Sequence, residues 1–181
     1  QTPICDFGQK AIPFELKSTD NKILSLEDIK GENGTLIMFI CNHCPYVKAV
    51  TKEIVEDCNE LKKIGINSVA ICANDAENYP EDSFENMIKF SKDNNFNFPY
   101  LNDETQNIAK AYDAVCTPDF FGYNKNLELQ YRGRLRELRN LIPVKEGESD
   151  LLKAMKQIAN TGEGPKDQIP SAGCSIKWKT N

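Results

Sequence analysis

The chain has 181 residues, of which 40% are hydrophobic and 27% charged, and its 22 basic and 27 acidic side chains give a net charge of −5. This length suits one domain of ordinary size, and an acidic chain without a block of Lys or Arg excludes nucleic acid as an expected partner. No apolar run approaches the roughly 18 residues of a membrane span. A leader could have been removed before Gln1, so the expected compartment is the cytoplasm or the periplasm.

The N-terminal part is expected to form a β-hairpin, followed by a buried strand. Residues 14–17 and 22–26 alternate between apolar and polar side chains and flank a polar turn, which is the pattern of two antiparallel strands. Residues 35–40 are almost wholly apolar, which is typical of a strand that is buried on both faces. A loop at residues 31–34 separates the hairpin from this strand.

An amphipathic helix and a second buried strand follow. After Pro45 the apolar residues recur at spacings of 3, 4, 4 and 3, which places them on one helical face: Val47, Val50, Ile54, Cys58 and Leu61. Gly65 ends this helix as a C-terminal cap, and residues 66–73 form another apolar run. Strand, helix and strand together predict a βαβ unit.

The second half is expected to alternate between short helices and strands. Three helices are predicted: one from Pro80, one over residues 106–112 and a last one that ends at Gly162. Strands are predicted at residues 98–101, 119–123 and 127–131. Residues 163–181 have no periodicity, but their apolar end around Trp178 predicts a tail that docks on the body. We therefore expect residues 1–162 to form one domain, with residues 163–181 as an extension of the same domain.

The most informative pattern is Cys41-Asn42-His43-Cys44, which lies between the buried strand and the amphipathic helix. The chain has seven cysteines, and an odd number at irregular spacing argues against a disulfide framework. At a helix start, two thiols meet unpaired N–H groups and the positive end of the helix dipole, which favour a thiolate. We expect Cys41 to be the nucleophile and Cys44, one turn into the helix, to be the resolving thiol. His43, the only histidine, is expected to favour the Cys41 thiolate.

A second clue is Thr117-Pro118, which precedes a predicted strand and hairpin. The order of predicted strands and helices, together with the sequence motifs at residues 39–45 and 117–121, resembles that of the thioredoxin superfamily. More narrowly, it resembles the redoxins of the alkyl hydroperoxide reductase/thiol-specific antioxidant (AhpC/TSA) type. The resemblance implies that Pro118 is cis and faces the dithiol, and that the backbone at Thr117 pairs with an extended substrate segment. It also implies that residues 74–104 are the element that redoxins insert into the thioredoxin core.

The expected fold is therefore α/β. It is a thioredoxin-like three-layer fold with a central mixed β-sheet flanked by helices, an N-terminal β-hairpin and a docked C-terminal tail. Two departures from the thioredoxin pattern leave the direction of electron flow unassigned. Ile40 stands in place of the tryptophan before the first cysteine, and Asn42-His43 stands in place of Gly-Pro. A histidine before the second cysteine resembles the disulfide-forming members of the superfamily.

A thiol peroxidase is the nearest alternative within the same fold. When Cys44 is aligned with the cysteine of the peroxiredoxin pattern Pro-x-x-x-Thr-x-x-Cys, Ile37 and Cys41 stand where the pattern requires Pro and Thr. Both residues that shape the peroxide pocket are therefore absent. A peroxiredoxin-type arginine would have to come from one of four candidates: Arg132, Arg134, Arg136 or Arg139.

Two further alternatives come from other classes of protein. A metal-binding protein could use Cys41, His43 and Cys44 together with Cys116 or Cys174, because zinc requires four ligands in a tetrahedron. The adjacent side chains of His43 and Cys44 point in different directions from a helix start, which argues against this set, and no metal is expected. A redox-inert binding module that keeps the fold is the other alternative.

The function that the sequence favours is thiol–disulfide exchange through Cys41 and Cys44, without a cofactor. The expected partners are disulfide-containing or dithiol protein substrates and an electron donor or acceptor that the sequence does not identify. Cys116, two residues before Pro118, and Cys174, in the docking tail, are candidates for additional redox thiols.

Overall fold

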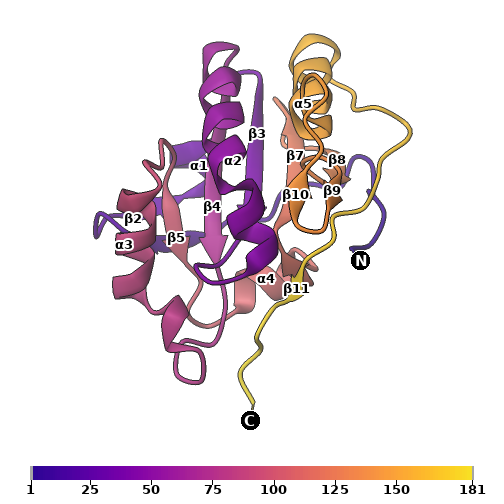
Figure 1. Ribbon diagram of the computed structural model, residues 1–181. Helices are drawn as coiled ribbons and strands as arrows, with labels where there is room; N and C mark the ends of the chain where they lie inside the picture. The colour runs from indigo at the N-terminus through magenta and orange to yellow at the C-terminus, as the bar shows by residue number, and fades with distance from the viewer. Residues whose placement is uncertain (1, 181) are drawn as a thin grey trace.

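A seven-stranded mixed β-sheet forms the centre of the computed structural model, which describes residues 2–180 (Figure 1). In order across the sheet, its strands are β2 (Ile23–Ser25), β1 (Glu15–Ser18), β5 (Tyr100–Asn102), β4 (Ile66–Cys72), β3 (Gly34–Phe39), β7 (Asp119–Asn124) and β8 (Leu129–Gly133). Two short pairs lie outside it: β9 (Leu138–Arg139) with β10 (Ile142–Pro143), and β6 (Cys116–Thr117) with β11 (Cys174–Ser175).

Helices cover both faces of this sheet. Apolar side chains of α2 (Pro45–Lys63), α3 (Phe84–Asp93) and α5 (Asp150–Thr161) pack on one face. Those of α1 (Leu26–Ile29) and α4 (Asn107–Ala111) pack on the other. The predicted three-layer, thioredoxin-like arrangement with its N-terminal hairpin is therefore confirmed. None of the helices in the described part of the chain is long and apolar enough to cross a membrane.

The predicted βαβ unit positions the candidate site. β3 pairs in parallel with β4 and antiparallel with β7, and all six of its residues are buried. α2 joins β3 to β4 and buries the five apolar residues of the predicted face. It begins at Pro45, and Gly65 beyond its end has a positive φ of 83°, which favours glycine. The start of α2, at its lower end in Figure 1, carries the dithiol.

Two short elements differ from the sequence predictions. Pro80 begins a separate 3-10 turn, η1 (Pro80–Asp82), instead of the predicted helix. α3 begins only after Ser83, whose hydroxyl accepts a hydrogen bond from the Asn86 N–H and so caps a new helix. α1 was not predicted, and it forms because Ser25 and Asp28 make a reciprocal capping box around a single helical turn.

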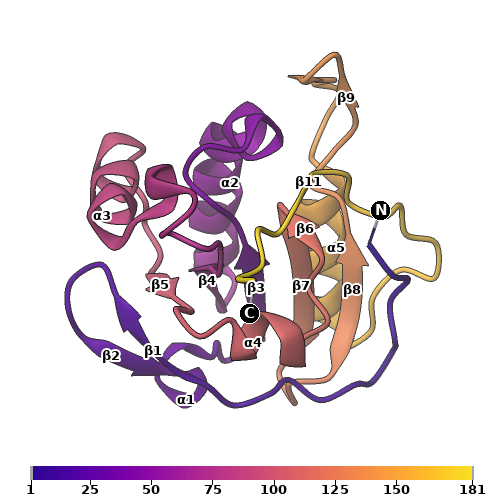
Figure 2. The same ribbon diagram turned by 90° about the horizontal axis from the view of Figure 1, so that it is seen from below.

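The C-terminal tail docks on the body beside β6, as the sequence predicted (Figure 2). β11 pairs antiparallel with β6, so that Cys174 lies opposite Thr117. Further along, the carbonyl of Lys177 accepts a hydrogen bond from the Asp75 N–H at 2.8 Å. The tail therefore crosses the end of the molecule where α2 begins (Figure 1).

Candidate active site

The Cys41–Cys44 dithiol lies where β3 ends and α2 begins. Both cysteines are free thiols, and 1% of each residue is exposed. Cys44 is the N-cap residue of α2, and Pro45 occupies the first helical position. The prediction that Cys44 lies one turn into the helix is therefore wrong, because proline, which has no N–H, starts the helix directly after it.

Thr117 contacts both sulfur atoms. Its hydroxyl oxygen lies 3.5 Å from Cys41 Sγ, and its carbonyl accepts a hydrogen bond from the Cys44 thiol at 3.3 Å. The Thr117–Pro118 peptide bond is cis, as the family resemblance implied. The fold thus brings the start of α2 and the end of β6, two segments far apart in the sequence, into one buried cluster.

The two thiols differ in how the surroundings stabilise their charged forms. A hydrogen bond from Cys41 holds the pKa of Cys44 well below its usual range, and the Cys174 thiol and the Val47 N–H act in the same direction. The bond to Cys44, burial and the nearby Asp82 carboxylate raise the pKa of Cys41. These contacts favour the thiolate on Cys44, whereas the sequence predicted it on Cys41.

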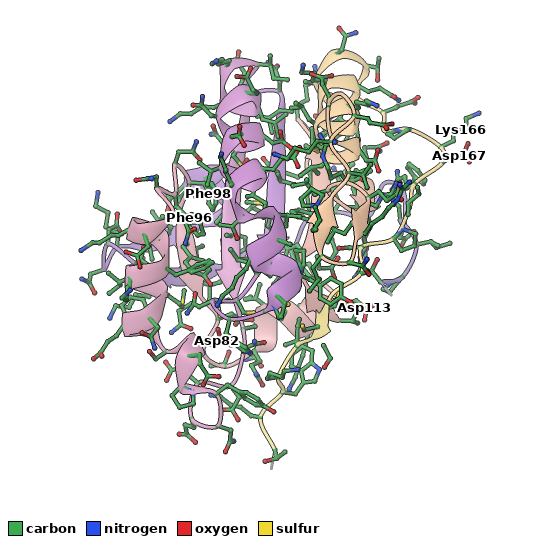
Figure 3. All side chains as sticks on the ribbon, viewed as in Figure 1. Asp82, Phe96, Phe98, Asp113, Lys166 and Asp167 are labelled. Atoms are coloured by element: carbon green, nitrogen blue, oxygen red, sulfur yellow. The ribbon has the colours of Figure 1, made fainter. Side chains whose placement is uncertain are left out.

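Asp82 is a buried carboxylate that the sequence analysis missed. The residue is 2% exposed, and it accepts hydrogen bonds from the Asn42 N–H and the Asn74 side chain, each at 2.8 Å. Nδ1 of His43 lies 2.7 Å from Asp82 Oδ2. Figure 3 shows Asp82 just beyond the end of α2 at which the dithiol lies. No local pattern marks this residue, because only the folding of η1 against residues 42–43 brings it to the site.

One cluster in the described part of the chain could hold a metal ion, and it consists of Cys41, His43 and Asp82. One ligand atom from each lies within 4.8 Å of the others. A thiolate, an imidazole and a carboxylate are ordinary ligands of zinc, which needs a fourth ligand to complete its tetrahedron. Compared with the set considered from the sequence, Asp82 takes the place of Cys44, and no other cysteine joins the cluster.

The two other candidate redox thiols lie differently with respect to the dithiol. Cys174 is half-buried in β11 and packs against the cluster that contains Cys44, and its thiol lowers the pKa of Cys44. The thiol of Cys116 is buried and lies 3.6 Å from the carbonyl oxygen of Pro118. Burial raises the pKa of Cys116 to about 12. Of these two thiols, Cys174 is therefore the one placed to exchange directly with Cys44.

The four arginines considered as peroxide-binding residues are engaged with carboxylates. The pairs are Arg132 with Asp119, Arg134 with Asp150, Arg136 with Glu53 and Arg139 with Glu137. The first and third of these pairs are buried, so their guanidinium groups are costly to release. Within residues 2–180 no hydrogen bond joins any of the four to the dithiol.

Fold and site together define a protein of thioredoxin-like fold that carries two thiols at the start of a helix, beside a cis-proline. Comparison with known proteins then gives the family. The AhpC/TSA family matches residues 7–137, and the chain belongs to this family.

Solved structures with similar sequences extend over the whole chain, including the tail. An uncharacterized conserved protein from Geobacillus kaustophilus shares 46% sequence identity, covers 100% of this chain and 95% of that one, and has a TM-score of 0.90. A hypothetical protein from Sinorhizobium meliloti 1021 shares 32% identity, with coverage of 100% and 99% and a TM-score of 0.92.

A more distant match shows the fold alone. A secreted disulfide oxidoreductase from Mycobacterium tuberculosis has a TM-score of 0.55 at 17% identity, over 65% of this chain and 80% of that one. No curated protein matches the chain.

Proposed function

We propose that the protein is a thiol–disulfide oxidoreductase that exchanges disulfides with protein or small-thiol substrates through Cys41 and Cys44. The observation that best supports this is that both sulfur atoms contact Thr117. This contact lies beside cis-Pro118 and at the start of α2. A thiolate at a helix start attacks disulfides, and a second thiol within reach releases the product. A separate electron donor or acceptor would complete the cycle.

The exchange begins at Cys44, whose thiolate the surroundings favour. Its sulfur attacks one sulfur of a substrate disulfide, forms a mixed disulfide and releases the other substrate sulfur as a thiolate. Cys41 then loses its proton and attacks Cys44 Sγ, and the second substrate sulfur leaves and takes up a proton. The products are the Cys41–Cys44 disulfide and a substrate with two thiols, and every step is reversible.

His43 is placed to receive the proton of Cys41. A ring nitrogen of His43, Cys41 Sγ and a carboxylate oxygen of Asp82 lie within 4.8 Å of one another, and the His43–Asp82 pair is separated by 2.7 Å. An imidazole beside a thiol can accept its proton. We therefore assign His43 as the base for the second step and Asp82 as its positioning residue.

Single-cysteine variants test this function. Cys41→Ser and Cys44→Ser should each abolish catalysed reduction of insulin, whereas Cys5→Ser, which changes a thiol near the N-terminus, should retain it. Peptide mapping of the oxidised wild type should find a Cys41–Cys44 disulfide. Full activity in a variant that lacks both Cys41 and Cys44 would contradict the proposal and favour a redox-inert binding module.

A thiol peroxidase is the alternative that membership of the AhpC/TSA family supports. The lowered pKa of Cys44 suits it, since a peroxide is also attacked by a thiolate. The ion pairs that hold the four arginines weigh against it. Hydrogen peroxide consumption by the reduced protein separates the two activities, because only a peroxidase should consume it far faster than free cysteine does.

A further inference from the structure

We propose that residues 171–177 of the chain are a displaceable internal strand, which occupies the edge of β6 and has to leave it before a polypeptide disulfide reaches the dithiol. The proposal deepens the proposed function, on which it rests, because it assigns to the same site a device that controls access to the dithiol. In the described part of the chain, β6 pairs with β11 alone.

The pairing itself shows why this edge serves the dithiol. In the antiparallel register Cys174 lies opposite Thr117, and the Thr117 carbonyl accepts the hydrogen bond from the Cys44 thiol. The Cys174 thiol in turn contacts Cys44. Any strand bound in this register therefore delivers the side chain opposite Thr117 to the Cys44 sulfur, because strand pairing fixes where each side chain points.

The residue before that cysteine has to be small. A Cβ atom built on Gly173 would lie 2.0 Å from the carbonyl oxygen and 2.7 Å from the carbonyl carbon of Thr117. Both are backbone atoms beside the cis peptide bond, so they cannot rotate away as a side chain would. The tail places Gly173-Cys174 at this point of the β6 edge. We infer that a polypeptide that replaces the tail also needs a glycine directly before its cysteine.

Contacts on both sides of Gly173 hold the tail in place. The Ser171 hydroxyl donates a hydrogen bond to the Pro118 carbonyl at 2.6 Å. Beyond β11, the Ile176 N–H donates to the Val115 carbonyl at 3.1 Å, and the Ile176 side chain is buried. The Lys177 backbone adds hydrogen bonds with Asn74, Asp75 and Gln106. All of these hydrogen bonds lie outside the seven-stranded sheet, so the segment can open without unfolding the domain.

The docked tail leaves the dithiol without access to a polypeptide disulfide. Cys41 and Cys44 are each 1% exposed, whereas attack requires a substrate sulfur to reach the Cys44 sulfur directly. The position that such a sulfur would take is filled by the Cys174 thiol. Exchange with a polypeptide therefore requires that the tail leave the β6 edge first.

Gly173→Ala in the full chain is the sharpest test, because the added methyl group meets the Thr117 carbonyl. Hydrogen exchange at the amides of residues 174–176 should become at least tenfold faster, and the rate of insulin reduction should rise by a similar factor. Ala172→Ser is the matched control, since residue 172 is exposed and next in sequence, and it should behave as the wild type. Unchanged exchange and unchanged rate in Gly173→Ala would overturn the proposal.

A peptide added in trans tests the binding edge directly. The peptide Ser-Ala-Gly-Ser-Ser-Ile-Lys, which copies residues 171–177 with Cys174→Ser, should inhibit the Gly173→Ala protein. The same peptide with Gly173→Ala should not inhibit. Equal inhibition by both peptides would overturn the assigned register. If Gly173→Ala does not fold, Ser171→Ala, which removes the bond to Pro118, carries the same measurements.

These readouts separate the inference from the proposed function. Hydrogen exchange and peptide binding report on the edge even in a protein that does not turn over insulin. Conversely, if the Cys41–Cys44 disulfide forms but the tail variants behave as the wild type, the proposed function stands and the proposed role of the tail is contradicted.

Discussion

The Asp82 carboxylate lies 2.7 Å from Nδ1 of His43 and within 4.8 Å of the Cys41 sulfur, although Asp82 ends η1 and the other two residues lie between β3 and α2. A buried carboxylate at this distance acts on the site in two ways. Its negative charge raises the pKa of Cys41, and its Oδ2 atom forms a close pair with Nδ1 of His43. Both effects can be measured separately from overall stability.

Replacement of Asp82 by Asn should make Cys41 ionise at lower pH. The change removes a negative charge that opposes the Cys41 thiolate, so the pKa of Cys41 falls. The measurement is the pH dependence of Cys41 alkylation in a Cys44→Ser background, with and without Asp82→Asn. Glu81→Gln, which neutralises the exposed carboxylate next in sequence, should leave the midpoint unchanged. An unchanged midpoint in Asp82→Asn would show that Asp82 does not act on Cys41.

Cys41→Ala should raise the pKa of Cys44 more than Cys41→Ser does. The hydrogen bond from residue 41 is the largest cause of the lowered pKa of Cys44. Serine keeps a donor at this position and alanine does not. Rates of Cys44 alkylation between about pH 5 and pH 9 should therefore show a higher midpoint in the alanine variant. Equal midpoints would mean that the thiolate depends on the start of α2 and not on Cys41.

Oxidation of Cys41→Ser with oxidised glutathione should yield a Cys44–Cys174 disulfide. Cys44 attacks glutathione disulfide and releases one glutathione, and Cys174, whose thiol contacts Cys44, then displaces the second. Peptide mapping identifies the bond. Cys116→Ser in the same background should leave the yield unchanged, because the Cys116 thiol is turned to the Pro118 carbonyl. A stable glutathione adduct on Cys44 as the sole product would rule out the role of Cys174.

The free energy of unfolding should depend on Asp57 between about pH 4 and pH 6. Burial raises the pKa of Asp57 to about 6 from 3.8, while the Ser149 hydroxyl donates to it at 2.7 Å. A raised folded-state pKa contributes stability that is full below pH 3.8 and lost as the pH rises through 6. Asp57→Asn should thus gain about 1–3 kcal/mol over the wild type as the pH rises from 4 to 7.

Urea denaturation at several pH values measures this difference. Asp167→Asn, which changes an exposed carboxylate, is the control and should show the same pH dependence as the wild type. A constant difference between Asp57→Asn and the wild type over this range would contradict the raised pKa.

The central βαβ unit could be predicted from the sequence because its signals are local. The apolar run of β3, the 3- and 4-residue spacing along α2 and the glycine after its end each report on neighbouring residues. The same local order placed the dithiol at the start of a helix. Its N-cap position differed by one turn from the prediction, since Pro45 starts the helix.

Two features of the dithiol's surroundings, the Asp82 carboxylate and the fit of Gly173 and Cys174, could be decided only by the tertiary structure. Asp82 lies on a 3-10 turn that no periodicity marks, and it becomes part of the site because η1 folds against Asn42 and His43. Gly173 and Cys174 lie in a tail without any repeat, and their fit to Thr117 depends on backbone pairing between distant segments. Sequence by itself identified Cys41 and Cys44 as the candidates for the sulfur chemistry and placed them between a strand and a helix, because helix and strand patterns are short-range. The charge and access of those sulfur atoms depend on contacts between distant segments, which exist only once the chain has folded.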